Sequence, residues 1–156
     1  MPDIIHAFFV NASPGRVFEM LSRVEGMNRQ WTKEASGEPK LDAEFRLYFG
    51  PGYDWRTRVT RYVPGSEFEL QMTEAHVDWA KSQVGCRLTP AVREKRACFL
   101  YHNGWPEANE HWRVSCYCWA MYLRVLRRNV EHGESVPYEK RLDVKYRQVQ
   151  TRIGAR

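Results

Sequence analysis

Histidine is the side chain of this sequence best suited to acid–base chemistry, because its charge changes near neutral pH. Among the five histidines, His102 stands near the end of an apolar segment, just before Asn103 and Gly104, which are typical of a turn. One hypothesis makes His102 a general base or a hydrogen-bonding group at the mouth of a pocket. The favoured interpretation is structural, with the ring orienting the turn, because no carboxylate stands at a fixed spacing from it.

Two further histidines stand close to acidic residues. His76 and Asp78 lie two apart in an irregular segment, and they could form an acid–base pair over a pocket. A solvated loop is the favoured interpretation, because residues two apart share a face only in a strand. His111 follows Glu110 at the start of a predicted helix, where the helix dipole already stabilises an acidic residue.

Spacings typical of metal or phosphate sites are absent from the sequence. It contains no HExxH motif, no facial triad, no calcium loop and no glycine-rich turn that opens a helix. It also lacks a GxSxG elbow, and its four cysteines form no CxxC pair. We therefore expect no metal, no cofactor and no nucleophilic catalysis, and we expect the thiols of a protein without a signal peptide to be reduced.

Arginine side chains could instead hold an acidic ligand. Arg56 and Arg58 share one face of a predicted strand, and Arg46 lies on the neighbouring strand. Guanidinium groups bind carboxylates in a bidentate manner, so this cluster would suit an anionic ligand if it lined a cavity. An outward, solvated sheet face explains the same residues more simply and is favoured.

Hydrophobic periodicity indicates the elements that must position these side chains. Period-two alternation predicts strands, and three- and four-residue steps predict helices. The predicted strands cover residues 4–10, 44–49, 55–62, 67–72, 84–88 and 97–102. Two short helical pieces follow the first strand, one near 14–23 and one ending near Trp31, and a long amphipathic helix covers 108–132. Gly133 is a natural stop for this last helix.

The order of these elements predicts the fold class. An antiparallel sheet of six strands presents one apolar face that must be covered, and the long helix is the only predicted element large enough to cover it. We predict an α+β fold in which a curved antiparallel sheet of six strands wraps around the long C-terminal helix, with two short helices after the first strand. Side chains fill the space between sheet and helix or leave a cavity there, and the aromatic content of 13% suits both outcomes.

Length, charge and hydropathy exclude several classes of protein. The 156 residues fit one domain, and 43% hydrophobic with 28% charged residues is typical of a soluble globular protein. Mean hydropathy is −0.63, and neither a membrane span nor a signal peptide is found, so we expect a cytoplasmic protein with no membrane partner. The net charge of +5 is concentrated beyond Gly133, where six basic residues stand against three acidic ones. Nucleic acid is therefore not expected as a partner.

Four segments, in this order, resemble the START-like, or SRPBCC, superfamily. They are the opening ASPGRVFEML of residues 12–21, the turn VPGSEF of residues 63–68, the segment CFLYHNGW of residues 98–105, and the pattern WxxxLxxL of residues 119–126. The branch that they look most like is related to the C-terminal domain of the heat-shock-protein-90 ATPase activator. Cys118 departs from the pattern, because such sequences usually carry glycine before the tryptophan.

The resemblance implies a helix-grip fold over residues 1–133. The basic extension at 134–156 departs from the family pattern, because it continues past the usual end of the domain, and it could cover the fold or mediate formation of a homodimer. The resemblance also implies a hydrophobic cavity between sheet and helix but no particular reaction. The function expected first is non-enzymatic binding of a hydrophobic or aromatic small molecule, mainly through burial of apolar surface. The alternatives are a co-chaperone-like module that binds a chaperone partner, and a cyclase- or hydrolase-like enzyme that uses His102.

The residues expected to bind the ligand come from strand centres and from the buried stripe of the long helix. They are Trp55, Met72, Leu100 and Trp119, with His102 as the polar group that orients the ligand. No catalytic residue is assigned, apart from His102 if the protein is an enzyme.

Overall fold

The computed structural model describes residues 1–92 and 95–142. In this part of the chain, seven strands form a single antiparallel sheet in the order β1-β7-β6-β5-β4-β3-β2. The strands are β1 (Ile4–Val10), β2 (Glu34–Ser36), β3 (Glu44–Gly50), β4 (Tyr53–Val63), β5 (Glu67–Glu74), β6 (Gln83–Val92) and β7 (Lys95–Asn103). The helices are α1 (Pro14–Ser22), α2 (Val24–Gln30) and α3 (Glu110–His132), and a 3₁₀ turn covers Tyr138–Lys140.

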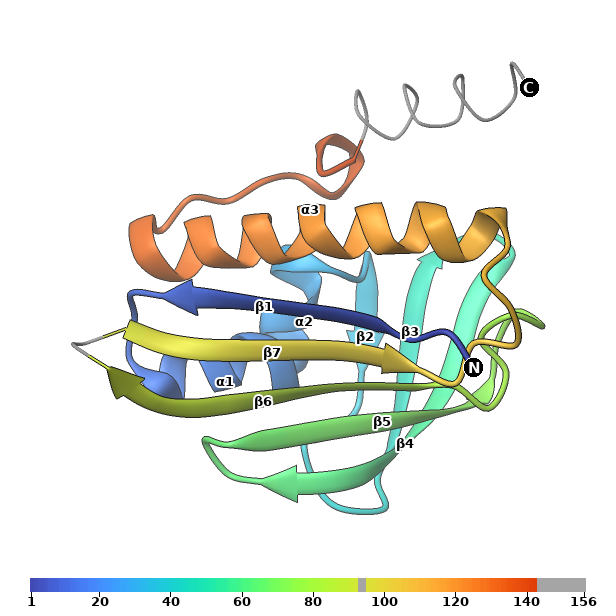
Figure 1. Cartoon of the computed structure of the whole chain (residues 1–156), viewed down its shortest axis with the longest axis horizontal. Helices are drawn as coiled ribbons and strands as arrows, with labels where there is room; N and C mark the ends of the chain where they lie inside the picture. The colour runs from blue at the N-terminus through green and yellow to red at the C-terminus, as the bar shows by residue number, and fades with distance from the viewer. Residues whose placement is uncertain (93–94, 143–156) are drawn as a thin grey trace.

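The long helix α3 covers one face of the curved sheet, and α1 and α2 pack on the same side (Figure 1). The predicted α+β helix-grip fold is thereby confirmed. The described residues form seven strands rather than the predicted six, because β2 adds three residues at the far edge, next to β3. In β2 only Ala35 is buried, and a strand this short shows too little alternation to stand out in a polar stretch.

The hydrophobic core lies between the inner face of the sheet and the buried stripe of α3. Phe45 and Leu47 on β3 and Leu70 on β5 are each 1% exposed or less. The buried stripe of α3 includes Trp119, Leu123, Leu126 and Val130. Burial of these surfaces contributes about 25 cal/mol per Å². In the part of the chain that the structure describes, no helix is both long and apolar enough to cross a membrane.

The junction between α1 and α2 places Trp31 over the core. Ser13 caps α1 by accepting a hydrogen bond from the Arg16 backbone N–H. Gly26 lets α2 approach α1 closely, because a Cβ atom there would lie 2.3 Å from the Cα of Met20. α2 ends at Gln30, and Trp31, which follows it directly, is only 4% exposed.

The two ends of α3 are fixed by caps, and the chain then turns back along the helix (Figure 1). Asn109 Oδ1 accepts from the Trp112 backbone N–H at 2.9 Å, and Gly133 ends α3 with φ of 69°, in the left-handed region that favours glycine. The buried Arg141 guanidinium then donates to the Thr32 carbonyl at 3.3 Å. Residues 134–142 of the predicted extension are thus tied to the end of α2, and residues 143–156 lie outside the described residues.

Candidate functional site

A cavity of about 280 Å³ opens between the first half of α3, the β3–β4 hairpin and the loop that joins β5 to β6. One face of α3 forms a wall of this cavity, because positions three and four apart lie on the same side of a helix. The residues of this wall are His111, Val114, Ser115, Cys118, Trp119 and Tyr122. The hydrophobic stripe of α3 therefore has two roles. Its second half covers the core, and its first half lines the open cavity.

Aromatic rings form much of the remaining wall. Trp31 directly follows α2, Trp55 lies on β4 and Trp79 lies in the β5–β6 loop. Together with Trp119, four of the six tryptophans line the cavity. The ring centroids of Trp31 and Trp119 are 4.9 Å apart, and Phe49 meets Trp31 edge to face at 5.6 Å. Ring-to-ring contacts of this kind favour particular orientations. The cavity therefore has a preformed apolar surface.

Residues that follow α3 close one side of the cavity. Tyr138 and Leu142 both line it, and the Tyr138 hydroxyl donates to the backbone carbonyl of Phe49 at 2.8 Å. Burial raises the pKa of Tyr138, so its hydroxyl remains a donor to even higher pH than an ordinary tyrosine. The Tyr138 bond links the segment after α3 to β3 across the edge of the cavity.

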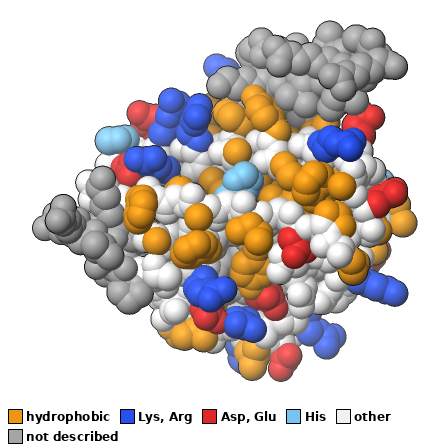
Figure 2. Space-filling model, in the orientation of Figure 1, with side chains coloured by type: hydrophobic (Ala, Val, Ile, Leu, Met, Phe, Trp, Pro, Cys, Tyr) orange, Lys and Arg blue, Asp and Glu red, His pale blue; other side chains and the backbone are white. Residues whose placement is uncertain are grey.

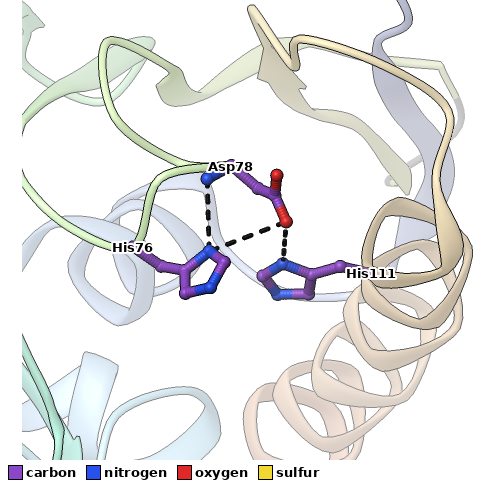
Figure 3. Close-up of side chains that lie close together, drawn as sticks. All are labelled: His76, Asp78 and His111. Carbon is purple, nitrogen blue, oxygen red and sulfur yellow. Dashed lines mark hydrogen bonds and ion pairs between the residues drawn. The ribbon is translucent and has the colours of Figure 1, made fainter.

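Two histidines and an aspartate meet at the wall of the cavity (Figure 3). His76 and Asp78 come from the β5–β6 loop, and His111 comes from the first turn of α3. The Nδ1–H of His111 donates to Asp78 Oδ2 at 2.8 Å, and His76 Nδ1 lies 3.6 Å from the same oxygen. Both imidazoles line the cavity. The cluster therefore brings two nitrogen bases and one carboxylate to the edge of an apolar space.

Hydrogen bonds hold the Asp78 carboxylate in its charged form. The bond from His111 is the main cause that lowers the pKa of Asp78, burial opposes it, and a bond with the Asn109 side chain acts in the same direction as His111. The Asp78 side chain is 15% exposed and that of His76 is 46% exposed. His76 is therefore largely solvated, as expected of this loop, whereas Asp78 in the same loop is partly shielded by its contact with His111.

The family of the chain follows from a comparison with known sequences. The model of the Activator of Hsp90 ATPase homolog 1-like protein family matches residues 11–131. The chain belongs to this family. The predicted resemblance is confirmed, and it covers most of the chain. No curated protein matches the sequence.

Solved structures share the fold of this family member at low sequence identity. The Aha1 dimer from Colwellia psychrerythraea has a TM-score of 0.78 and 22% identity, over 86% of this chain and 100% of that one. A protein from Mesorhizobium loti has a TM-score of 0.74 and 14% identity, over 85% and 99%. CalU16 from Micromonospora echinospora has a TM-score of 0.69 and 19% identity, over 98% and 84%. Likeness at these identities shows a common fold.

The predicted ligand-binding residues fall into two groups. Trp55 and Trp119 line the cavity of this Activator of Hsp90 ATPase homolog 1-like protein. Met72 and Leu100 lie in the core, and each is 2% exposed. Leu100 borders a separate void of about 20 Å³ beneath Trp119, which is room for about one water molecule. Periodicity identified all four as facing inward, but it could not tell which end of the sheet carries the cavity.

His102, the predicted polar group, is completely buried and has partners on both ring nitrogens. The Trp119 indole N–H donates to Nδ1 at 3.3 Å, so the ring proton sits on Nε2 and is donated to the Ser82 hydroxyl at 2.8 Å. The rings of Trp79 and Trp105 lie 4.8 and 4.9 Å from the imidazole. Burial, with a smaller effect of His111, lowers the pKa of His102 to about 3. These contacts suit a structural role for His102, but the neutral ring bonds to Ser82 of the β5–β6 loop and to Trp119 of α3, not to the Asn103–Gly104 turn as predicted.

The arginine cluster lies away from the cavity. Arg46 forms a bidentate contact with Asp54, with distances of 2.8 and 2.9 Å, and Arg58 is exposed. The favoured interpretation of a solvated outer face agrees with these positions.

Sequence reasoning did not assign His111 and Asp78 to one site. They are 33 residues apart, and searches for local metal motifs do not detect such a pair. The signal that could have placed His111 is the stripe of α3, because two steps of four residues back from Trp119 lead through Ser115 to His111. The position of Asp78 depends on how the loop folds over the sheet, which no periodicity encodes.

Proposed function

We propose that this protein binds an aromatic or hydrophobic small molecule in the cavity between α3, the β3–β4 hairpin and the β5–β6 loop. The observation that carries this proposal is the wall, in which four tryptophans and Phe49 border about 280 Å³. An apolar cavity of about 150 Å³ accommodates benzene, so this space suits a molecule of about two rings. Each Å² of apolar surface that the ligand buries contributes about 25 cal/mol.

Polar groups on one side of the cavity give the ligand an orientation. His76, His111 and Ser115 line the cavity together, and Ser115 follows His111 by one turn of α3. Ligand sites are typically apolar with a few polar groups that fix the pose. A ring system with one polar end, directed toward the two imidazoles, matches this distribution.

Tryptophan fluorescence tests the proposal directly, because four of the six tryptophans line the cavity. Titration with naphthalene is expected to quench the emission to saturation at one molecule per chain. Val114→Phe adds a ring inside the cavity and is expected to weaken binding by about tenfold or more. Ala120→Phe, at an exposed position of the same helix, serves as the matched control and is expected to bind as the wild type does.

Two outcomes contradict the proposal: the absence of saturable quenching, and an equal loss of affinity in Val114→Phe and Ala120→Phe. Native mass spectrometry of the protein purified from its host then identifies the natural ligand. A stoichiometric mass increase that disappears on organic extraction is the expected result.

A second candidate function is self-association, which exposed apolar side chains on the outer face of the sheet favour. On the edge strand β1, Ile5 is 66% exposed and Phe9 is 59% exposed. Phe99 on β7 pairs with Ala7 on β1, so it lies diagonally next to both. Hydrophobic side chains gather over this part of the molecule (Figure 2). The Aha1 protein from Colwellia psychrerythraea was itself solved as a dimer.

Sedimentation velocity tests self-association of this chain. The wild type is expected to sediment as a homodimer and Phe9→Lys as a monomer, because a charge on this face opposes burial. Val63→Lys, at an exposed apolar position on β4, is the control and is expected to remain dimeric. A wild type that stays monomeric at high concentration contradicts this function.

A further inference from the structure

The cluster of His76, Asp78 and His111 brings two electron-rich atoms of different side chains close together. The backbone N–H of Asp78 donates to His76 Nδ1 at 3.2 Å, so this nitrogen carries a lone pair and its proton sits on Nε2. His76 Nδ1 lies 3.6 Å from Asp78 Oδ2, which already accepts a hydrogen bond from His111. A cation bound to His76 Nδ1 and Asp78 Oδ2 would take the place of the Asp78 N–H at this lone pair and would be attracted by the carboxylate.

His111 supplies a third donor atom at a suitable distance. The donor atoms of the three side chains all lie within 4.8 Å of one another. Atoms bound to a Zn²⁺ ion at about 2.0–2.2 Å lie roughly 3–4 Å apart, and the His76–Asp78 separation of 3.6 Å already falls in this range. The His111–Asp78 distance of 2.8 Å is that of a hydrogen bond, and a metal ion would replace its proton with a small opening of the pair.

Neighbouring residues hold the three side chains in place. The Asn109 side chain caps α3 within one turn of His111 and also helps to lower the pKa of Asp78, so it lies beside both parts of the cluster. The ring of Trp79 stacks on His111 with an interplanar angle of 8°, and the rings of His76 and His111 meet edge to face at 5.0 Å. Contacts of this kind orient metal ligands and raise metal affinity.

We propose that His76, Asp78 and His111 bind one divalent transition-metal cation, such as Zn²⁺, at the wall of the cavity. Two imidazoles and one carboxylate suit Zn²⁺ or Co²⁺, whereas Ca²⁺ and Mg²⁺ take mainly oxygen ligands. Three protein ligands leave a coordination position open. Because both imidazoles line the cavity, an open position is accessible from it and takes water or an oxygen atom of a bound molecule.

The metal site also defines the class of ligand, a step that rests on the proposed function. A molecule with an aromatic ring system and a carboxylate at one end would place the carboxylate on the cation and its rings against the tryptophans. The cation therefore selects anionic over neutral aromatic ligands of the same size.

Binding of Zn²⁺ and Co²⁺ to the full chain, freed of metal with a chelator, tests the metal site. Isothermal titration calorimetry is expected to give one Zn²⁺ per chain. Asp78→Asn and His111→Gln are each expected to weaken this binding by about tenfold or more. His132→Gln is the matched control, because this exposed histidine lies on the same helix, roughly 30 Å from His111 along the axis.

Three results overturn the metal site: no stoichiometric Zn²⁺ binding by the wild type, an equal loss of affinity in His132→Gln, or a thiolate charge-transfer band in the Co²⁺ spectrum. The third result would place the metal on a cysteine such as Cys118, which also lines the cavity. Burial raises the pKa of Cys118 to about 12, so an imidazole and carboxylate spectrum is expected instead. Circular dichroism in chelator verifies folding, and His76→Gln, at the most exposed ligand, replaces either variant if it fails to fold.

Titration with 2-naphthoate and naphthalene, each with and without Zn²⁺, tests the ligand class. Zn²⁺ is expected to strengthen 2-naphthoate binding by about tenfold or more and to leave naphthalene binding unchanged. Asp78→Asn keeps the size of the side chain and is expected to reduce the strengthening at a Zn²⁺ concentration that just saturates the wild type. Equal 2-naphthoate affinity with and without bound Zn²⁺ overturns the coordination of ligands by the metal.

The two proposals can fail separately in this experiment. Zn²⁺ binding without naphthalene binding supports the metal site and contradicts the proposed function. Naphthalene binding without Zn²⁺ binding supports the proposed function and contradicts the metal site.

Discussion

Two histidines that both contact the ring of Trp79 differ in what their own ring nitrogens contact. His102 is buried, and its nitrogens bond to the neutral groups of Trp119 and Ser82. His111 is 38% exposed, bonds to the Asp78 carboxylate and lines the cavity. The Trp79 ring meets His102 edge to face at 4.8 Å and stacks on His111 at 6.3 Å. The same residue type thus belongs to the core in one case and to the candidate site in the other, although both rings contact the same indole.

The two histidines should contribute differently to stability, because an unpaired hydrogen-bond partner costs more free energy in the core than at the surface. Removal of a buried ring leaves its hydrogen-bond partners without water, whereas the partners of a half-exposed ring can turn to solvent. Stability should therefore depend strongly on His102 and weakly on His111, and binding should show the opposite dependence.

Replacement of His102 is expected to have the largest effect on stability. His102→Leu approximates the volume of the ring but leaves the Ser82 hydroxyl and the Trp119 indole N–H buried without their partner. The expected loss in the free energy of unfolding is about 2–4 kcal/mol, measured by urea unfolding. His102→Gln, which can still bond to Ser82, is expected to recover part of this loss. Wild-type stability in His102→Leu would remove the distinction between the two histidines.

Acidification is expected to destabilise the protein through the same ring. The pKa of His102 is lowered to about 3 in the folded state, and the unfolded value is about 6.5. As the pH falls below about 6.5, the unfolded chain takes up the proton first, so stability present above this pH is lost progressively toward pH 3. The contribution of one such group is at most about 1.4 kcal/mol per pH unit.

Urea unfolding in chelator at several pH values between about 5 and 7 measures this contribution. Carboxylates whose pKa is lowered, such as Asp54 and Asp78, act mainly below this window, because unfolded carboxyl groups titrate near pH 4. The slope is expected to be shallower in His102→Gln than in the wild type. Equal slopes would mean that His102 takes up its proton without loss of the fold.

The sequence predicted most of the fold because hydrophobic periodicity reports which side of each element is buried. The segments with period-two alternation form strands β3 to β7, and the hydrophobic stripe predicted the long helix α3 that covers them. The exception, β2, is held by pairing to β3 in a stretch where one buried residue, Ala35, carries no pattern. Backbone pairing with β3, not side-chain alternation, defines that strand.

The candidate site was predicted only in part, because a cavity depends on where packing stops. Trp55 and Met72 both face inward, but only Trp55 lies where the β3–β4 hairpin and the β5–β6 loop diverge from α3. The meeting of Asp78 with His111 depends on the fold of that loop and on the start of α3 at Asn109. Such long-range arrangements are absent from the local spacings that a single sequence provides.

Removal of one tyrosine hydroxyl at the edge of the cavity is expected to have a smaller effect on stability than removal of the His102 ring. Tyr138→Phe removes the half-buried bond to the Phe49 carbonyl at the edge of the cavity, and the expected loss in the free energy of unfolding is about 0.5–1.5 kcal/mol. Tyr48→Phe, on the outer face of β3, is the matched control and is expected to change stability less. If Tyr138→Phe loses no stability, the segment after α3 does not depend on this bond for its place at the cavity.

Replacement of His111 in the metal-free protein is expected to have the smallest effect on stability. The His111–Asp78 pair is partly solvated, and such pairs contribute about 0–1 kcal/mol. In His111→Gln the amide can still donate to Asp78, so urea unfolding in chelator should give a free energy within that range of the wild type. A loss as large as that of His102→Leu would show that His111 supports the core as well. A small loss, combined with the expected loss of Zn²⁺ affinity, would separate the two histidines by function. His102, whose ring nitrogens both have hydrogen-bond partners, holds the β5–β6 loop, and His111, beside the Asp78 carboxylate, remains available for binding.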